Sequence, residues 1–149
     1  MTKGLSRCTV VIVVVGILAA FPRANQQTDS AKACATLVGT WRIASGVYGG
    51  QERVSTLGRT TLKHVTPTQF AWLSYGADGI VTRAAGGGYT LKGDIYEETP
   101  EYGFSSDFDV VKGKAQRFAC RIEGNKWYSK GSLSNGLTIE EVWERVEPK

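Results

Sequence analysis

The chain has 149 residues, a formal net charge of +4, three cysteines, one histidine and 18 glycines. This length favours one domain with a sizeable core, and 42% hydrophobic with 21% charged residues excludes wholesale disorder and fibrous repeats. Three cysteines are too few for a disulfide-dense scaffold, and one histidine excludes a multi-histidine metal or catalytic cluster within the chain.

The N-terminus has the pattern of a secretory signal peptide, which we assign to residues 1–24. Lys3 and Arg7 precede an apolar run over 9–21, which is shorter than the roughly 20 residues that usually span a bilayer. An uncleaved signal-anchor is the alternative. We therefore expect an exported protein, periplasmic or secreted, that is tethered to a membrane if the signal is not cleaved. The candidate cleavage positions are Ala20, Ala24 and the small-x-small segment 31–33.

Removal of residues 1–24 changes both the charge and the cysteine count. The basic residues fall from 18 to 15 against 14 acidic ones, so the mature net charge is +1. This near-neutral charge, without a basic cluster interleaved with aromatics, argues against nucleic-acid binding. Cys34 and Cys120 remain, and they form either a disulfide, as an oxidising compartment favours, or two separate buried thiols.

Residues 25–36 are predicted to be a polar leader, and residues 37–149 a single antiparallel β domain. β-branched and aromatic runs alternate with turn signals such as Asp78-Gly79 and Asn135-Gly136. Regular spacing without a sustained helical period favours an up-and-down β-barrel of eight or nine strands. The expected strands are 38–48, 60–66, 69–76, 79–85, 88–93, 95–99, 115–123, 126–134 and 137–146.

Two segments interrupt this rhythm of strands. The Gly86-Gly87-Gly88 run predicts a flexible hairpin or bulge between two short strands. Residues 100–112 predict a longer loop, with room for one helical turn, of the kind that shapes the mouth of a cavity.

The first and last strands carry a pattern with a known counterpart. The domain opens with Gly39-Thr40-Trp41, and its last strand ends with Arg145. A Gly-x-Trp on the first strand with an Arg on the last resembles the lipocalin and wider calycin pattern. The resemblance implies that Trp41 plugs the closed end of the barrel and that Arg145 packs across its ring, as a structural pair.

Longer stretches resemble the small, largely uncharacterised bacterial lipocalin-like domains. These stretches cover residues 63–75, 84–103 and 123–146, so that the likeness extends over most of the mature chain. The resemblance implies the fold, and it brings no activity, substrate or catalytic residue with it.

Large rings with a few polar groups are the side chains that line ligand pockets, and this domain is rich in them. Glu98 joins this set because it shares strand parity with Tyr96. The alternative is that the rings fill the core, since a barrel of about eight strands is either filled by side chains or holds one small ligand. The candidate cavity-lining residues are Phe70, Trp72, Tyr89, Tyr96, Glu98, Phe118, Trp127 and Trp143.

The remaining candidates for chemistry are weaker. His64 could hold haem, but a strand-surface histidine is the favoured interpretation. Glu97 and Glu98 are adjacent on a strand and so point to opposite faces, which favours a solvated acidic rim over a paired-carboxylate or calcium site. No sequence pattern indicates a catalytic motif, a metal or a cofactor.

The leading functional hypothesis is non-catalytic binding of a small apolar or amphipathic ligand inside the barrel. An envelope structural, interaction or inhibitor protein that acts through loops 49–59 and 100–112 is the alternative. A small barrel enzyme that uses Glu98, Tyr96 or His64 is a third hypothesis. The expected partner is a small hydrophobic ligand, with no membrane span after signal cleavage, and the sequence does not indicate an oligomeric state.

Overall fold

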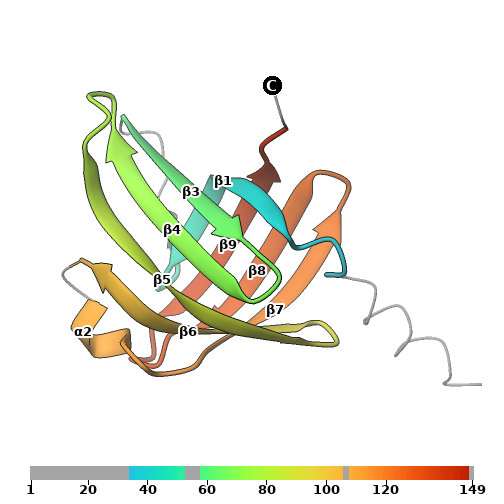
Figure 1. Ribbon diagram of the computed structural model, residues 1–149. Coiled ribbons are helices and arrows are strands. Elements are labelled where there is room, and N and C mark those ends of the chain that lie inside the picture. Colours follow the sequence, from blue (N-terminus) through green and yellow to red (C-terminus); the bar gives the residue numbers. More distant parts are fainter. Residues whose placement is uncertain (1–33, 53–57, 106–107, 148–149) are drawn as a thin grey trace, which may run out of the picture.

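The computed structural model describes residues 34–52, 58–105 and 108–147, so the predicted signal peptide and most of the predicted leader lie outside the described residues. Neighbouring strands are antiparallel, and pairing of the first strand with the last closes an eight-stranded barrel with β2 as an extra strand (Figure 1). The elements are β1 (Gly39–Tyr48), β2 (Gln51–Glu52), β3 (Arg59–Val65), β4 (Gln69–Gly76), β5 (Val81–Lys92), β6 (Ile95–Phe104), α2 (Phe108–Val111), β7 (Gln116–Glu123), β8 (Lys126–Ser132) and β9 (Thr138–Arg145).

The up-and-down order follows from the short turns of the sequence. From β3 to β9, each strand pairs with the next strand along the chain. Side chains alternate between the two faces, so that in β7 Phe118 and Cys120 are buried while Arg117 and Arg121 are exposed. The predicted antiparallel up-and-down barrel is therefore confirmed.

Residues 86–88 were predicted to form a hairpin or a bulge between two short strands. The structure shows a bulge and no hairpin. The two strands expected around it are one strand, β5, and the pairing of β5 with β6 shifts register between Gly86 and Gly87. A Cβ atom at Gly87 would overlap the carbonyl oxygen of Thr99, so the glycine lets the two strands approach closely. Glycine here serves strand packing instead of chain reversal.

The predicted loop over 100–112 is only partly a loop. β6 continues to Phe104, and the expected helical turn is present as α2. The amide of Gly113, just after α2, donates a hydrogen bond to the carbonyl of Pro100 in β6 at 2.7 Å. This segment therefore lies against the end of β6, beside the open end of the barrel (Figure 1).

The segment from Cys34 to Val38 covers the other end, which we call the closed end. Cys34 and Leu37 are buried in the same core cluster as Trp41 and Cys120. A disulfide joins Cys34 to Cys120 of β7, with their Cα atoms 6.1 Å apart, inside the range of roughly 4.4–6.8 Å typical of disulfides. The chain is thus fixed to the barrel before the first strand begins.

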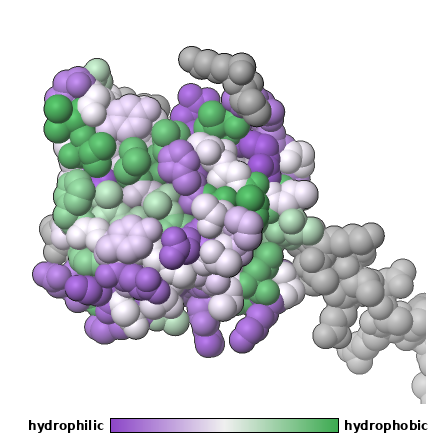
Figure 2. Space-filling view, in the orientation of Figure 1, coloured by the Kyte–Doolittle hydropathy of each residue, from purple (hydrophilic) through white to green (hydrophobic). Residues whose placement is uncertain are grey.

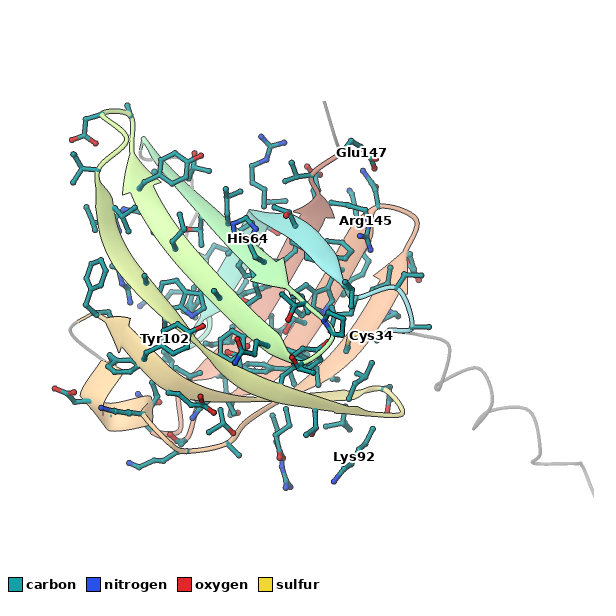
Figure 3. The ribbon with its side chains drawn as sticks, in the orientation of Figure 1. Cys34, His64, Lys92, Tyr102, Arg145 and Glu147 are labelled. Carbon is teal, nitrogen blue, oxygen red and sulfur yellow. A yellow bond between two sulfur atoms is a disulfide. The ribbon has the colours of Figure 1, made fainter. Side chains whose placement is uncertain are left out.

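Trp41 and Arg145 complete the closed end. The guanidinium carbon of Arg145 lies 4.1 Å from the centroid of the Trp41 ring, and the Trp41 indole donates to the Leu37 carbonyl at 2.8 Å. Arg145 also donates to the carbonyls of Thr36 and Val38. Figure 3 shows Arg145 at the same end of the barrel as Cys34. One arginine therefore holds the tryptophan plug and the covering segment together.

Replacing Arg145 with lysine is expected to lower the free energy of unfolding by about 1–2 kcal/mol, because lysine lacks the planar fork that stacks on indole and donates to two carbonyls. Urea denaturation followed by far-UV circular dichroism measures the change. The matched control is Arg42→Lys on the exposed face of β1, for which we expect a change within about 0.5 kcal/mol. Equal effects of the two substitutions would contradict the role given to Arg145.

Candidate functional site

Lys63 is the polar centre of the barrel interior. It alternates with the exposed His64 on β3, and its register partners are Trp41 of β1 and Trp72 of β4. Its side chain is only 6% exposed, and its Nζ atom lies 2.8 Å from a carboxylate oxygen of Glu98 on β6, which is also buried. The interior of the barrel therefore contains a buried ion pair among its apolar side chains.

Four aromatic rings surround the ammonium group of Lys63. Its Nζ atom lies 5.2 Å from the ring centroid of Trp127 and 5.4 Å from those of Phe70, Tyr96 and Trp143. All four distances are within the range of about 6 Å over which a cation is attracted to a ring face. We call these four rings the aromatic box; it offsets part of the desolvation of the lysine.

Glu141 of β9 is the second interior carboxyl group. Its two oxygens accept hydrogen bonds from the Tyr48 hydroxyl, at 2.7 Å, and from the Trp143 indole, at 3.0 Å. Although solvent reaches part of the residue, its carboxylate is desolvated, and this raises the pKa of Glu141 above its ordinary value. The charge of Lys63 and the two hydrogen bonds act on this pKa in the opposite direction.

Two fully buried polar atoms beside the ion pair have no hydrogen-bond partner among the described residues. They are the hydroxyl of Tyr96 and the indole nitrogen of Trp127, and both residues are 0% exposed. Burial, followed by the charge of nearby Glu98, raises the pKa of Tyr96 well above its usual value, although its hydroxyl makes no bond of good geometry to that carboxylate. Both groups are therefore donors to which the described residues offer no acceptor in good geometry.

Aromatic contacts fill the half of the interior nearest the closed end. Trp127 contacts Trp41, Tyr96 and Trp143, with ring centroids 5.7, 5.4 and 5.9 Å apart. This half of the barrel agrees with the alternative in which the rings form a core. A ligand in the interior would therefore lie between the aromatic box and the open end.

The interior becomes more polar toward the open end. Thr61 of β3 and Ser74 of β4 join their hydroxyls at 2.7 Å, and Trp72 beside them is only partly buried. Arg83 lies over the Trp72 ring, 6.0 Å from its centroid, and is exposed. Trp72 and Arg83 are therefore less shielded from solvent than Phe70, Tyr96 and Trp127 of the aromatic box.

Apolar side chains are exposed around the same end. Ile80 at the tip of the β4–β5 hairpin is 61% exposed, and Phe104 at the end of β6 is 53% exposed. Figure 2 shows apolar atoms gathered over the β4–β5 hairpin. The exposed apolar residues on the elements of this end are Ile80, Val81, Phe104, Val110 and Leu137. They give the mouth an apolar rim.

Two shallow hollows lie outside the barrel. The larger, of about 680 Å³, runs over the outer face of β7, β8, β9 and β1, where Tyr128 and Val142 line it. The smaller, of about 370 Å³, is lined by residues of β5, β6 and β7. Glu141, which also lines the larger hollow, has its carboxylate directed toward Tyr48 and Trp143.

The structure places all eight predicted cavity-lining residues on the inner face of the barrel. Five of them meet at one point: Glu98 pairs with Lys63, and Phe70, Tyr96, Trp127 and Trp143 form the aromatic box. The other three lie around this point, since Tyr89 and Phe118 pack against Tyr96 and Trp72 is the register partner of Lys63. Their binding role stays a prediction.

Sequence reasoning missed Lys63 and Glu141. Lys63 shares strand parity with Val65, which is buried, so alternation along β3 carried a signal for its inward position. Glu141 has the parity of Trp143 and Ile139, which are both buried. In both strands, a charged residue that shares its face with apolar residues indicates a charge directed into the barrel.

The other candidates lie outside the interior. His64 is exposed on the outer face, where its Nδ1 atom is 3.0 Å from the Thr40 hydroxyl. Glu97 pairs with Arg117 on the outer face, opposite to Glu98 as predicted. In the described ranges, no three His, Cys, Asp or Glu side chains are grouped as metal ligands would be. Within those ranges, no helix has the length and apolar character needed to cross a membrane.

Comparisons with known proteins bear on the fold. No protein-family model matches the sequence, and no curated protein matches it significantly. A lipocalin-like protein from Bacteroides uniformis ATCC 8492 is similar in structure, with a TM-score of 0.50, 13% sequence identity, and coverage of 74% of this chain and 98% of that chain. A redesigned β-barrel matches with a TM-score of 0.50, 18% identity, and coverage of 78% and 97%.

An uncharacterized protein from Bacteroides eggerthii DSM 20697 is a third structural match, with a TM-score of 0.49, 15% identity, and coverage of 73% of this chain and 98% of that one. At such identities, the matches concern the fold alone. The two matches with a TM-score of 0.50, together with the closed eight-stranded topology, show that this chain has a lipocalin-like β-barrel fold.

Proposed function

We propose that the protein binds a small, largely apolar molecule with one polar end inside the barrel, without catalysing a reaction on it. The observation that carries the proposal is the pair of unpartnered donors, Tyr96 and Trp127, buried beside the Lys63–Glu98 ion pair. A buried donor without an acceptor costs about 1–3 kcal/mol, and such atoms are few in native proteins. A bound polar group would supply the missing partners.

The distribution of polarity along the barrel supports the same proposal. The polar end of the ligand would lie at the aromatic box, and its apolar part would extend toward the apolar rim around Ile80 and Phe104. Ligand pockets commonly combine aromatic walls with a few polar groups that fix orientation. The interior of this barrel has both components.

The charged groups are arranged for binding more than for proton transfer. Glu98 is neutralised by Lys63, and the raised pKa of Tyr96 keeps its hydroxyl protonated at neutral pH. Tyr96 and Glu98 do lie together, as the enzyme hypothesis required, but His64 is on the opposite face of its strand. A binding role uses these groups without requiring any of them to exchange a proton.

Thr61→Trp tests whether ligands enter through the open end. Thr61 points into the partly buried half of the interior, so an indole there is expected to weaken binding of decanol by at least tenfold, as filling a pocket should. Tryptophan fluorescence titration measures the affinity, and circular dichroism checks the fold. Thr60→Trp, on the outward-facing neighbour, is the matched control and should leave the affinity unchanged. No saturable binding of decanol by the unaltered protein would contradict the proposal.

We also propose that the protein is exported. The Cys34–Cys120 disulfide supports this, because such bonds persist in oxidising compartments. The signal peptide predicted over residues 1–24 supports it from the sequence side.

A further inference from the structure

The charged groups inside the barrel have no net positive charge. One ammonium group, that of Lys63, faces two carboxyl groups, those of Glu98 and Glu141. Both carboxyl groups are close enough to Lys63 to interact with its charge. If Glu141 is ionised the interior charge is −1, and if Glu141 is protonated the charge is zero. A carboxylate that enters the barrel therefore meets no net attraction from these three groups.

Lys63 is also unavailable as a partner for an incoming anion. Its Nζ atom is 2.8 Å from Glu98, and the four rings of the aromatic box lie within 5.4 Å of it. An anionic head group would have to displace Glu98 and leave that carboxylate buried without its partner, which is strongly unfavourable. A ligand ammonium would in turn be repelled by Lys63 at the box that Lys63 already occupies.

The two buried donors, Tyr96 and Trp127, need a hydrogen-bond acceptor. The indole N–H of Trp127 is a donor only, and the protonated hydroxyl of Tyr96 has a donor to offer. An uncharged oxygen satisfies such donors without adding charge to the site. The exposed guanidinium of Arg83 lies at the mouth, over Trp72, where water screens its charge.

We infer that the barrel interior selects an uncharged amphipathic ligand whose polar end is a hydrogen-bond acceptor, such as the oxygen of an aliphatic alcohol or ester, and rejects fatty carboxylates. Glu98 is the residue that sets this preference, because it occupies the only ammonium group among the buried side chains of the described interior. The inference rests on the proposed function, since it specifies the ligand class of the same site.

The test compares three probes of equal chain length on the full chain at neutral pH: decanol, methyl decanoate and decanoate, each below its aggregation concentration. Titration calorimetry or tryptophan fluorescence gives the three affinities. We expect decanol and methyl decanoate to bind with similar affinity, and decanoate to bind about tenfold or more weakly, because it adds a charge to a site without positive charge. Similar affinities for the alcohol and the ester show that accepting, not donating, is what the site requires.

Glu98→Gln is the decisive variant. It keeps the shape of residue 98 and releases the ammonium of Lys63, so the ratio of decanoate to decanol affinity is expected to rise by at least tenfold. Glu97→Gln, the adjacent residue on the outer face, is the matched control and should leave the ratio unchanged. If Glu98→Gln does not fold, Glu141→Gln against Glu140→Gln provides a second pair, with a smaller rise expected because Lys63 stays paired.

The outcomes separate the inference from the proposed function. If the unaltered protein binds none of the three probes, the proposed function fails. If it binds decanoate as tightly as decanol, or if the ratio is the same in Glu98→Gln and Glu97→Gln, the inference is overturned while ligand binding stands. If decanol binds and methyl decanoate does not, the requirement for an acceptor is wrong.

Discussion

Replacing Lys63 with methionine is expected to lower the free energy of unfolding by about 3–5 kcal/mol, the usual cost of leaving one partner of a buried ion pair alone. Glu98, whose side chain is 8% exposed, would remain in the interior without its partner. Urea denaturation followed by tryptophan fluorescence measures the loss, and the midpoint should fall with little change in slope.

Lys130→Met is the matched control for this substitution. Lys130 also pairs with a glutamate, Glu140, but both side chains are more than half exposed, so we expect a loss of less than about 1 kcal/mol. The double variant with Lys63→Met and Glu98→Met removes both charges and should recover most of the stability lost in the single variant. A single variant that unfolds at the same urea concentration as Lys130→Met would contradict a buried ion pair.

Cys34→Ser is expected to lower the free energy of unfolding by about 2–5 kcal/mol, because the disulfide closes a long loop and so restricts the unfolded chain. The two cysteines are separated by 86 positions, for which loop-closure entropy alone gives about 4–5 kcal/mol. The loss also includes the release of the segment that covers the closed end. Denaturation with and without a reducing agent measures the contribution.

Two controls accompany the cysteine experiment. In the full chain, with residues 1–24 retained, Cys8→Ser should not change stability, since the bridge joins Cys34 and Cys120. Adding a reducing agent should destabilise the unaltered protein and leave Cys34→Ser unaffected. Sensitivity of Cys34→Ser to the reducing agent would show that a different pair of cysteines carries the effect.

The barrel could be predicted because its local signals agree with one another. Turn pairs such as Asp78-Gly79 and Asn135-Gly136 lie between strands whose side chains alternate, and this consistency specifies both register and topology. Trp41 and Arg145 were identifiable because the resemblance placed them on the two strands that close the barrel. Cys34 and Cys120 were left open in the sequence, since no sequence pattern shows whether two Cα atoms approach each other.

The interior ion pair could not be predicted in the same way. Parity puts Glu98 on the inner face, but nothing local in the sequence says that Lys63, 35 positions away, will meet it. The glycines at 86–88 misled for a related reason: a run of glycine permits a turn, but here the approach of β6, which the sequence does not display, determines its use. Both the position of the ion pair and the role of the glycines depend on contacts between strands that are not visible in the local sequence.

The Arg145 contacts with Thr36 and Val38 bring the beginning and the end of the barrel domain together at the closed end. The two ends of the described chain, Cys34 and Glu147, therefore lie on the side opposite the mouth. The same geometry makes either terminus suitable for attachment to a solid support, because the entrance would stay clear of the surface.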